Sequence, residues 1–143
     1  MLRYANVYGP NQTPKGEGGV VAIFLDRIKK GLPIIIHGNG EQTRDFVYVK
    51  DVVKANLAAI QKGENEIINI GTANPTTVNQ LAHILSKIHG KQIVITNSKA
   101  RPGDIEHSCL DNSKADKILH WSPIYSIDQG LKETYDFVMQ QML

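Results

Sequence analysis

The sequence predicts an α/β protein, and two observations support this prediction. Short runs rich in β-branched residues alternate with longer segments whose apolar residues recur at helical spacing. The 143 residues are 41% hydrophobic and 21% charged, which is an ordinary globular composition and excludes wholesale disorder. This length fits one domain or a large fragment of one.

The first predicted element is a strand over Leu2 to Tyr8, and the breaker pair Gly9-Pro10 ends it. A loop from Asn11 to Gly18 follows, because this segment is rich in glycine and proline. The next segment predicts a helix that ends at Gly31. The apolar residues of this helix recur at i, i+3, i+4 and i+7 and are Val21, Phe24, Leu25 and Ile28.

The middle of the chain predicts further short strands and a helix. Pro33 opens the apolar run Ile34 to Ile36, and His37 to Gly40 forms a turn. The segment Phe46 to Val49 is typical of a strand. Asp51 is placed to cap a helix. The apolar residues that share one face of that helix are Val53, Leu57 and Ile60.

The remaining elements are predicted by strand runs and by capping residues. Strands are expected at Ile67 to Gly71, which ends in a glycine turn, and at Gln92 to Thr96. Asp111 is placed to cap a short helix that runs through Leu119. Two capping boxes, Thr77 with Gln80 and Ser126 with Gln129, predict the starts of two longer helices.

Charge and composition exclude several kinds of partner. The net charge of +2 favours neither nucleic acid nor an anionic membrane surface. Cys109 is the single cysteine and cannot form an internal disulfide, which favours a reducing cytoplasm. The five histidines are scattered, so no metal site is expected. No apolar run approaches the ~20 residues of a membrane span.

Four separated stretches carry a family resemblance. They are Leu2 to Pro10, Gly38 to Val52, Asn69 to Gly71, and Arg101 to Asp104 with Asp111 to Ala115 behind it. In this order and spacing they resemble the C-terminal half of the NAD-dependent epimerase/dehydratase family, the extended short-chain dehydrogenase/reductases. The resemblance implies that residues 1–143 form a single α/β nucleotide-sugar-binding domain that lacks most of the Rossmann half.

The activity implied by the resemblance is nucleotide-sugar 4-epimerisation, in which NAD removes and returns a hydride at C4 of the sugar. A 4,6-dehydratase, a UDP-glucuronate decarboxylase, and a non-catalytic remnant or binding module are the alternatives. The family's Gly-rich cofactor turn and its Tyr-x-x-x-Lys pair precede the first matched stretch, and neither motif occurs in this sequence. We therefore expect no catalytic residue, no bound NAD and no activity in the chain alone. The expected partners are a UDP-sugar and a separate chain that carries the Rossmann half.

The resemblance also implies a substrate site. It places Arg44 and Arg101 on the diphosphate, where a planar guanidinium forms charge-assisted bonds. Asp104 would accept bonds from the ribose hydroxyls, and Asn6 would contact the sugar or its phosphate. The residues placed around the base are Val20, Val21, Ile35, Ile36 and His37. The residues placed beside the nicotinamide are Tyr4 and Ala5.

Each of these assignments has a structural alternative. The alternative for Arg44 is a surface residue paired with Asp45 or Glu41, although the resemblance favours the diphosphate role. The apolar residues assigned to the base are explained as well by core packing. For His37, which stands beside a glycine, a turn residue is favoured over stacking on a base.

Overall fold

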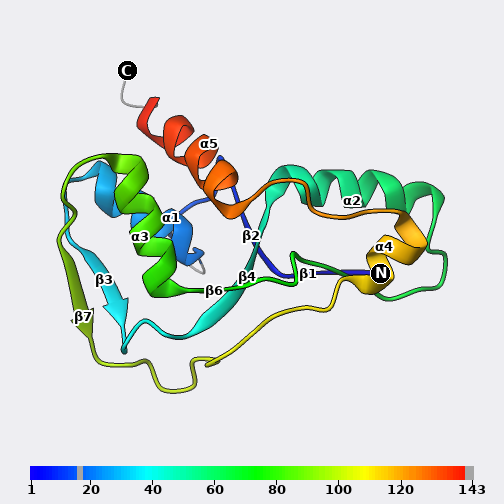
Figure 1. Cartoon of the computed structure of the whole chain (residues 1–143), viewed down its shortest axis with the longest axis horizontal. Coiled ribbons are helices and arrows are strands. Elements are labelled where there is room, and N and C mark those ends of the chain that lie inside the picture. Colours follow the sequence, from blue (N-terminus) through cyan, green and yellow to red (C-terminus); the bar gives the residue numbers. More distant parts are fainter. Residues whose placement is uncertain (16–17, 141–143) are drawn as a thin grey trace.

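The computed structural model describes residues 1–15 and 18–140, and it confirms the predicted mixed α/β fold (Figure 1). Gly16 and Glu17 of the predicted loop lie outside these residues. The strands are β1 (Leu2–Tyr4), β2 (Asn6–Tyr8), β3 (Ile34–His37), β4 (Thr43–Tyr48), β5 (Ile68–Ile70), β6 (Pro75–Thr77) and β7 (Ile95–Ser98). The helices are α1 (Val20–Lys29), α2 (Val49–Gln61), α3 (Val78–His89), α4 (Ser113–Leu119) and α5 (Ile127–Gln140).

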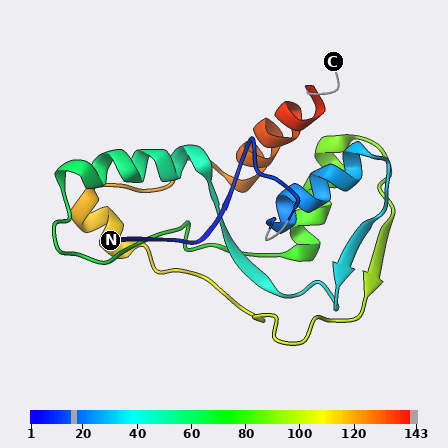
Figure 2. The same ribbon diagram turned by 180° about the vertical axis from the view of Figure 1, so that it is seen from behind.

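Strand β4 lies between two hydrophobic cores. It pairs in parallel with β2 and antiparallel with β6. Because side chains alternate along a strand, Phe46 and Tyr48 enter a core with α1, α3 and α5, while Val47 enters a core with α2, α4 and β5. Both views show these two groups of helices on opposite sides of β4 (Figures 1 and 2).

The strand predicted over Leu2 to Tyr8 is divided between two sheets, so this prediction was only partly correct. The first part, β1, pairs in parallel with β5, whereas the second part, β2, pairs in parallel with β4. Between them, the Ala5 amide donates to the Ile70 carbonyl at 2.9 Å. The chain therefore changes its pairing partner at Ala5, and this change brings β4 alongside Asn6.

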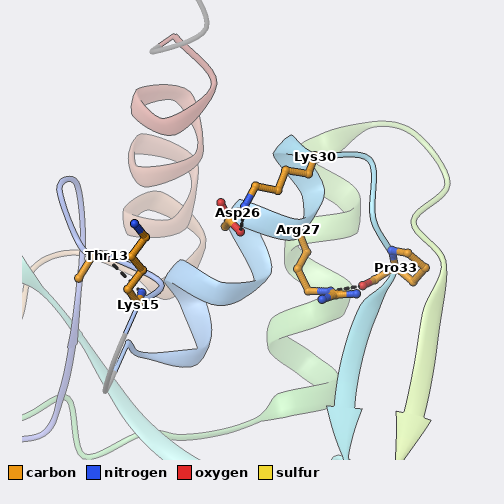
Figure 3. A network of polar contacts seen from close by, with 6 residues as sticks. All are labelled: Thr13, Lys15, Asp26, Arg27, Lys30 and Pro33. Carbon is orange, nitrogen blue, oxygen red and sulfur yellow. Dashed lines mark hydrogen bonds and ion pairs between the residues drawn. The ribbon is translucent and has the colours of Figure 1, made fainter.

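Strands β3 and β7 form a separate parallel pair beside α1 and α3. The predicted strand Gln92 to Thr96 is shifted toward the C-terminus, because β7 takes its register from β3, with Ile34 opposite Ile95 and His37 opposite Ser98. At the end of α1, Arg27 donates from Nε to the Pro33 carbonyl, as Figure 3 shows. This contact ties the end of the helix to the start of β3.

Helix α2 differs from its prediction in two ways. It begins at Val49 directly after β4, so Asp51 lies in the first turn and is not its cap. The Asp51 carboxylate is buried and accepts from the backbone amides of Ile124 and Tyr125 at 3.1–3.2 Å. The predicted apolar residues do share a face, but that face is exposed, with exposed fractions of 51% for Val53, 62% for Leu57 and 78% for Ile60. The buried side of α2 carries Val52 and Ala55.

Both predicted capping boxes are confirmed. Thr77 and Gln80 exchange their two bonds at the start of α3, and Ser126 and Gln129 do the same before α5. Helix α4 begins one residue later than an Asp111 cap would place it, although Asp111 accepts a bond from the Ser113 amide at 2.9 Å. Within residues 1–15 and 18–140, no helix has the length and apolar character needed to cross a membrane.

Candidate functional site

A cavity of about 190 Å³ lies where β2, β3, β4 and α1 approach one another. Side chains from distant parts of the sequence line it. They are Asn6, Val20, Phe24, Ile35, Ile36, His37, Gln42, Arg44, Val78, Arg101 and Asp104. A hollow of about 430 Å³ continues beside it and shares His37, Gln42, Arg101 and Asp104 with its lining.

The cavity lies at the carboxyl ends of two parallel strands. His37 ends β3 and Ser98 ends β7, and the two residues are opposite each other (Figure 1). Ligands of α/β proteins commonly bind outside this edge of a sheet, because the loops that follow the strands converge there. The position of the cavity therefore favours a ligand site over a packing defect.

Arg44 reaches the cavity from β4. Its Nη1 donates to the Thr43 carbonyl at 2.8 Å, and its side chain forms no ion pair among the described residues. The neighbouring carboxylate of Asp45 points to the other face of the strand, where it accepts from the Thr72 amide at 2.8 Å and from the Thr72 hydroxyl at 2.6 Å. The alternative pairing of Arg44 with Asp45 is therefore absent.

Arg101 and Asp104 reach the same cavity from the long loop between β7 and α4. Gly103 has φ +82°, and the Asp104 amide donates to the Arg101 carbonyl at 3.2 Å, so the segment is a turn. The loop is fixed further along, where Thr43 pairs with residues 106–108. Both side chains are exposed, and Nη2 of Arg101 lies 2.8 Å from Nε2 of His37. Two guanidinium groups from separate segments thus line one cavity.

Three lining residues were not predicted as part of a site. Gln42 donates from Nε2 to the His37 carbonyl at 2.9 Å. It directly precedes β4 and stands two residues before Arg44, and this spacing is a signal that the sequence contains, because alternate residues of an extended chain point to the same side. Phe24 and Val78 belong to the hydrophobic core and also reach the cavity wall. Apolar residues of this kind predict core packing, so their contact with the cavity could not be predicted from the sequence.

Three predicted residues lie elsewhere. Val21 is 1% exposed in the core and is not among the residues that line the cavity. Tyr4 is 46% exposed on β1, and its hydroxyl donates to Asn56 Oδ1 at 2.7 Å. Ala5 contributes the backbone bond to β5 already described. No group of three histidine, cysteine or carboxylate side chains that could hold a metal occurs among the described residues.

Two glycines that follow strands are closely packed by other parts of the chain. A pyrophosphate binds where a glycine turn after a strand leaves its backbone accessible at the start of a helix. After β2, a Cβ at Gly9 would meet the Val49 side chain, and after β5 a Cβ at Gly71 would meet the Asp45 carboxylate. Protein side chains therefore fill the space beside both glycines.

The comparisons with known proteins agree with this architecture. Residues 1–71 match the family described as the NAD dependent epimerase/dehydratase family. The chain is a member of this family, and its fold corresponds to part of an extended short-chain dehydrogenase/reductase. Its relatives include UDP-glucose 4-epimerases and related decarboxylases.

In particular, the chain resembles UDP-glucose 4-epimerases over nearly its whole length. The crystal structure of the Thermotoga maritima UDP-glucose 4-epimerase with UDP-glucose is 50% identical, with a TM-score of 0.93, over 99% of this chain and 46% of that one. A Methanocaldococcus jannaschii protein provisionally named UDP-glucose 4-epimerase is 45% identical over 96% of this chain and 45% of its own length. The Bacillus cereus UDP-glucuronic acid 4-epimerase, in complex with UDP-glucuronic acid and NAD, is 34% identical, with a TM-score of 0.89, over 98% of this chain and 45% of that one. The chain thus spans about half the length of these relatives.

Proposed function

We propose that this chain binds the nucleoside diphosphate part of a nucleotide sugar, and that it serves as the substrate half of an NAD-dependent 4-epimerase. The observation that carries the proposal is the convergence of Arg44 and Arg101 on one cavity. A diphosphate offers the acceptor oxygens that two planar guanidinium groups recognise. The Thermotoga maritima relative, which holds UDP-glucose in its crystal, makes a UDP-sugar the first choice of ligand.

The other lining residues suit the rest of such a ligand. Asp104 is exposed beside Arg101 and presents a carboxylate, which accepts from two vicinal ribose hydroxyls. Val20 and Ile35 provide an apolar wall for a base. Asn6 also lines the cavity, at the start of β2, where its amide can donate to and accept from a sugar.

The chain alone should lack epimerase activity. Epimerisation by this family's route needs NAD and an acid–base pair, and no tyrosine in this sequence has a lysine four residues later. We therefore propose that it acts with a partner polypeptide that supplies the NAD-binding part of the relatives. The NAD-binding part would also set the reaction. Dehydration and decarboxylation, which other relatives are named for, are therefore the alternative activities.

The exposed apolar face of α2 is the surface we assign to that partner. Val53, Leu57 and Ile60 form it, and Tyr4 of β1 lies beside it through its bond to Asn56. Strand β1 pairs only with β5 among the described strands, so its other edge is available for a further strand. A partner that continues this parallel sheet would bring its own helices onto the faces of the sheet, as parallel sheets require, and one of them could pack on the apolar face of α2.

Titration of the chain with UDP and with uridine, followed by NMR at fixed ionic strength, tests the ligand proposal. We expect UDP to shift resonances of the cavity residues with a dissociation constant of roughly 1 mM, equivalent to about −4 kcal/mol. Uridine, which lacks the diphosphate, should bind more weakly. Equal shifts from UDP and uridine would show that the guanidinium groups do not bind phosphate, and no shift from either would contradict the proposed function.

A further inference from the structure

The cavity contains a chain of polar contacts that the ligand assignments do not use. His37 lies between two partners, with Nδ1 2.7 Å from Ser98 Oγ and Nε2 2.8 Å from Arg101 Nη2. His37 and Ser98 end the paired strands β3 and β7, whereas Arg101 belongs to the loop that follows. The contacts therefore join a flexible cationic side chain to the rigid edge of a sheet.

The chemistry of arginine fixes where the proton of His37 lies. A guanidinium group only donates hydrogen bonds, so Nε2 of His37 must accept from Arg101. An imidazole that accepts at Nε2 is neutral and carries its proton on Nδ1. Nδ1 then donates to Ser98 Oγ. Hydrogen bonds thus run in one direction, from Arg101 to His37 and from His37 to Ser98.

Arg101 is the residue that needs such support. Its side chain is exposed, and among the described residues its guanidinium forms no ion pair. A long side chain of this kind loses much rotamer freedom when it is fixed on a ligand. The His37 backbone is held on both sides, by pairing with β7 and by the bond from Gln42 to its carbonyl.

We propose that His37, kept in its Nδ1-protonated form by Ser98, is a positioning residue that aims the Arg101 guanidinium into the cavity. The proposal rests on the proposed function, because it makes Arg101 a preorganised phosphate ligand. It differs from stacking of His37 on a base, which requires the ring plane and not an accepting Nε2. The two roles therefore predict different effects of changing the ring.

The protonation state is measured first, without any ligand. Long-range ¹H–¹⁵N spectra of the imidazole nitrogens at about pH 8, where histidine is neutral, report which nitrogen holds the proton. We expect Nδ1–H in the wild type, and a shift toward Nε2–H in Arg101→Ala and in Ser98→Ala. His83, exposed on α3, is the reference and should not change. Nε2–H in the wild type, or an unchanged ring in both variants, would overturn the proposal.

Affinity for UDP then separates positioning from stacking. His37→Phe keeps an aromatic ring but has no acceptor, and we expect it to weaken UDP binding about three- to tenfold, as for one lost hydrogen bond. His37→Gln keeps an acceptor and should recover part of that loss. In an Arg101→Ala background the effect of His37→Phe should disappear, because the two residues act as one unit.

The opposite results have distinct meanings. Losses from His37→Phe and Arg101→Ala that simply add would show that His37 does not act through Arg101. Unchanged UDP binding by His37→Phe, together with weakened uridine binding by His37→Gln, would assign His37 to the base instead. If the wild type binds no UDP, the proposed function fails, and the ring measurement still decides whether His37 holds Arg101.

Discussion

The Tyr48 hydroxyl donates to Glu133 Oε2 at 2.8 Å and so ties the end of β4 to α5. Lys50 Nζ reaches the same oxygen at 2.6 Å. The bond from Lys50, and to a smaller extent the bond from Tyr48, lowers the pKa of the Glu133 carboxyl below its usual range. Burial, and then the bond to Glu133, raises the pKa of Tyr48. The cluster fastens α5 across the strand that carries Arg44.

Acid should destabilise the wild type more than Glu133→Gln. A carboxyl with a lowered folded pKa contributes its stabilisation fully above the usual glutamate pKa of about 4.3, and loses it as the pH falls through the folded pKa. Urea unfolding at about pH 7 and at about pH 3 measures the loss. The exposed Glu64→Gln serves as the control and should lose as much as the wild type. The same acid loss in Glu133→Gln would contradict this assignment.

Replacement of Asp45 by asparagine should destabilise the fold by about 2–4 kcal/mol. The Asp45 side chain is buried and accepts bonds from Thr72, Ala73 and Leu110. The amide group of asparagine would turn a donor toward these donors and leave a buried group unpaired. Urea unfolding measures the effect. Asp104→Asn, which is exposed, should change stability by less than about 0.5 kcal/mol, and similar losses in the two variants would be inconsistent with this prediction.

Gly40→Ala should cost more stability than Gly31→Ala. Both glycines have positive φ, +79° and +65°. A Cβ at Gly31 meets nothing within 4 Å, so this variant reports the backbone strain alone, about 1 kcal/mol. A Cβ at Gly40 would overlap the Asn79 amide, which donates to the Asn39 carbonyl at 2.9 Å. Thermal unfolding of both variants gives the comparison, and an equal loss would mean that Asn79 moves aside freely.

Arg44→Ala and Arg101→Ala should each weaken UDP binding by about 1.5–3 kcal/mol, since each removes charge-assisted bonds. Arg3→Ala is the matched control, because Arg3 is exposed on β1 and does not line the cavity. NMR titrations at two salt concentrations measure the affinities, and the difference between variants should shrink at high salt. UDP binding that is insensitive to all three substitutions would place the phosphate elsewhere.

Leu57→Lys should abolish association with an NAD-binding partner while leaving the chain folded. Leu57 is 62% exposed, so a lysine there costs little stability, but it would put a charge in an apolar interface. The probe is the separately expressed part of the Methanocaldococcus jannaschii relative that this chain does not match, with gel filtration and UDP-glucose epimerisation as readouts. His83→Lys adds the same charge on α3 and should associate like the wild type. Complex formation by Leu57→Lys would exclude this face as the interface.

Local features of the structure could be predicted from the sequence. Each capping box depends only on two residues three apart, Thr77 with Gln80 and Ser126 with Gln129. Its bonds therefore do not depend on contacts with distant parts of the chain. The family resemblance rests on short motifs in order, and it indicated Arg44 and Arg101 as members of one site. Arg44 and Arg101 line the same cavity, which is consistent with the assignment from the resemblance.

The tertiary structure decided what depends on segments far apart in the chain. Whether Leu2 to Tyr8 forms one strand or two was set by β4 and β5, which follow one helix and two helices later in the chain. The spacing of Val53 and Leu57 defined an apolar face of α2, but the contacts of Asp51 with residues 124–125 turned the opposite face inward. Periodicity states which residues share a face, whereas burial of that face depends on what packs against it. The bond from Arg101 to His37 joins residues 64 positions apart, and only the folded chain brings them together.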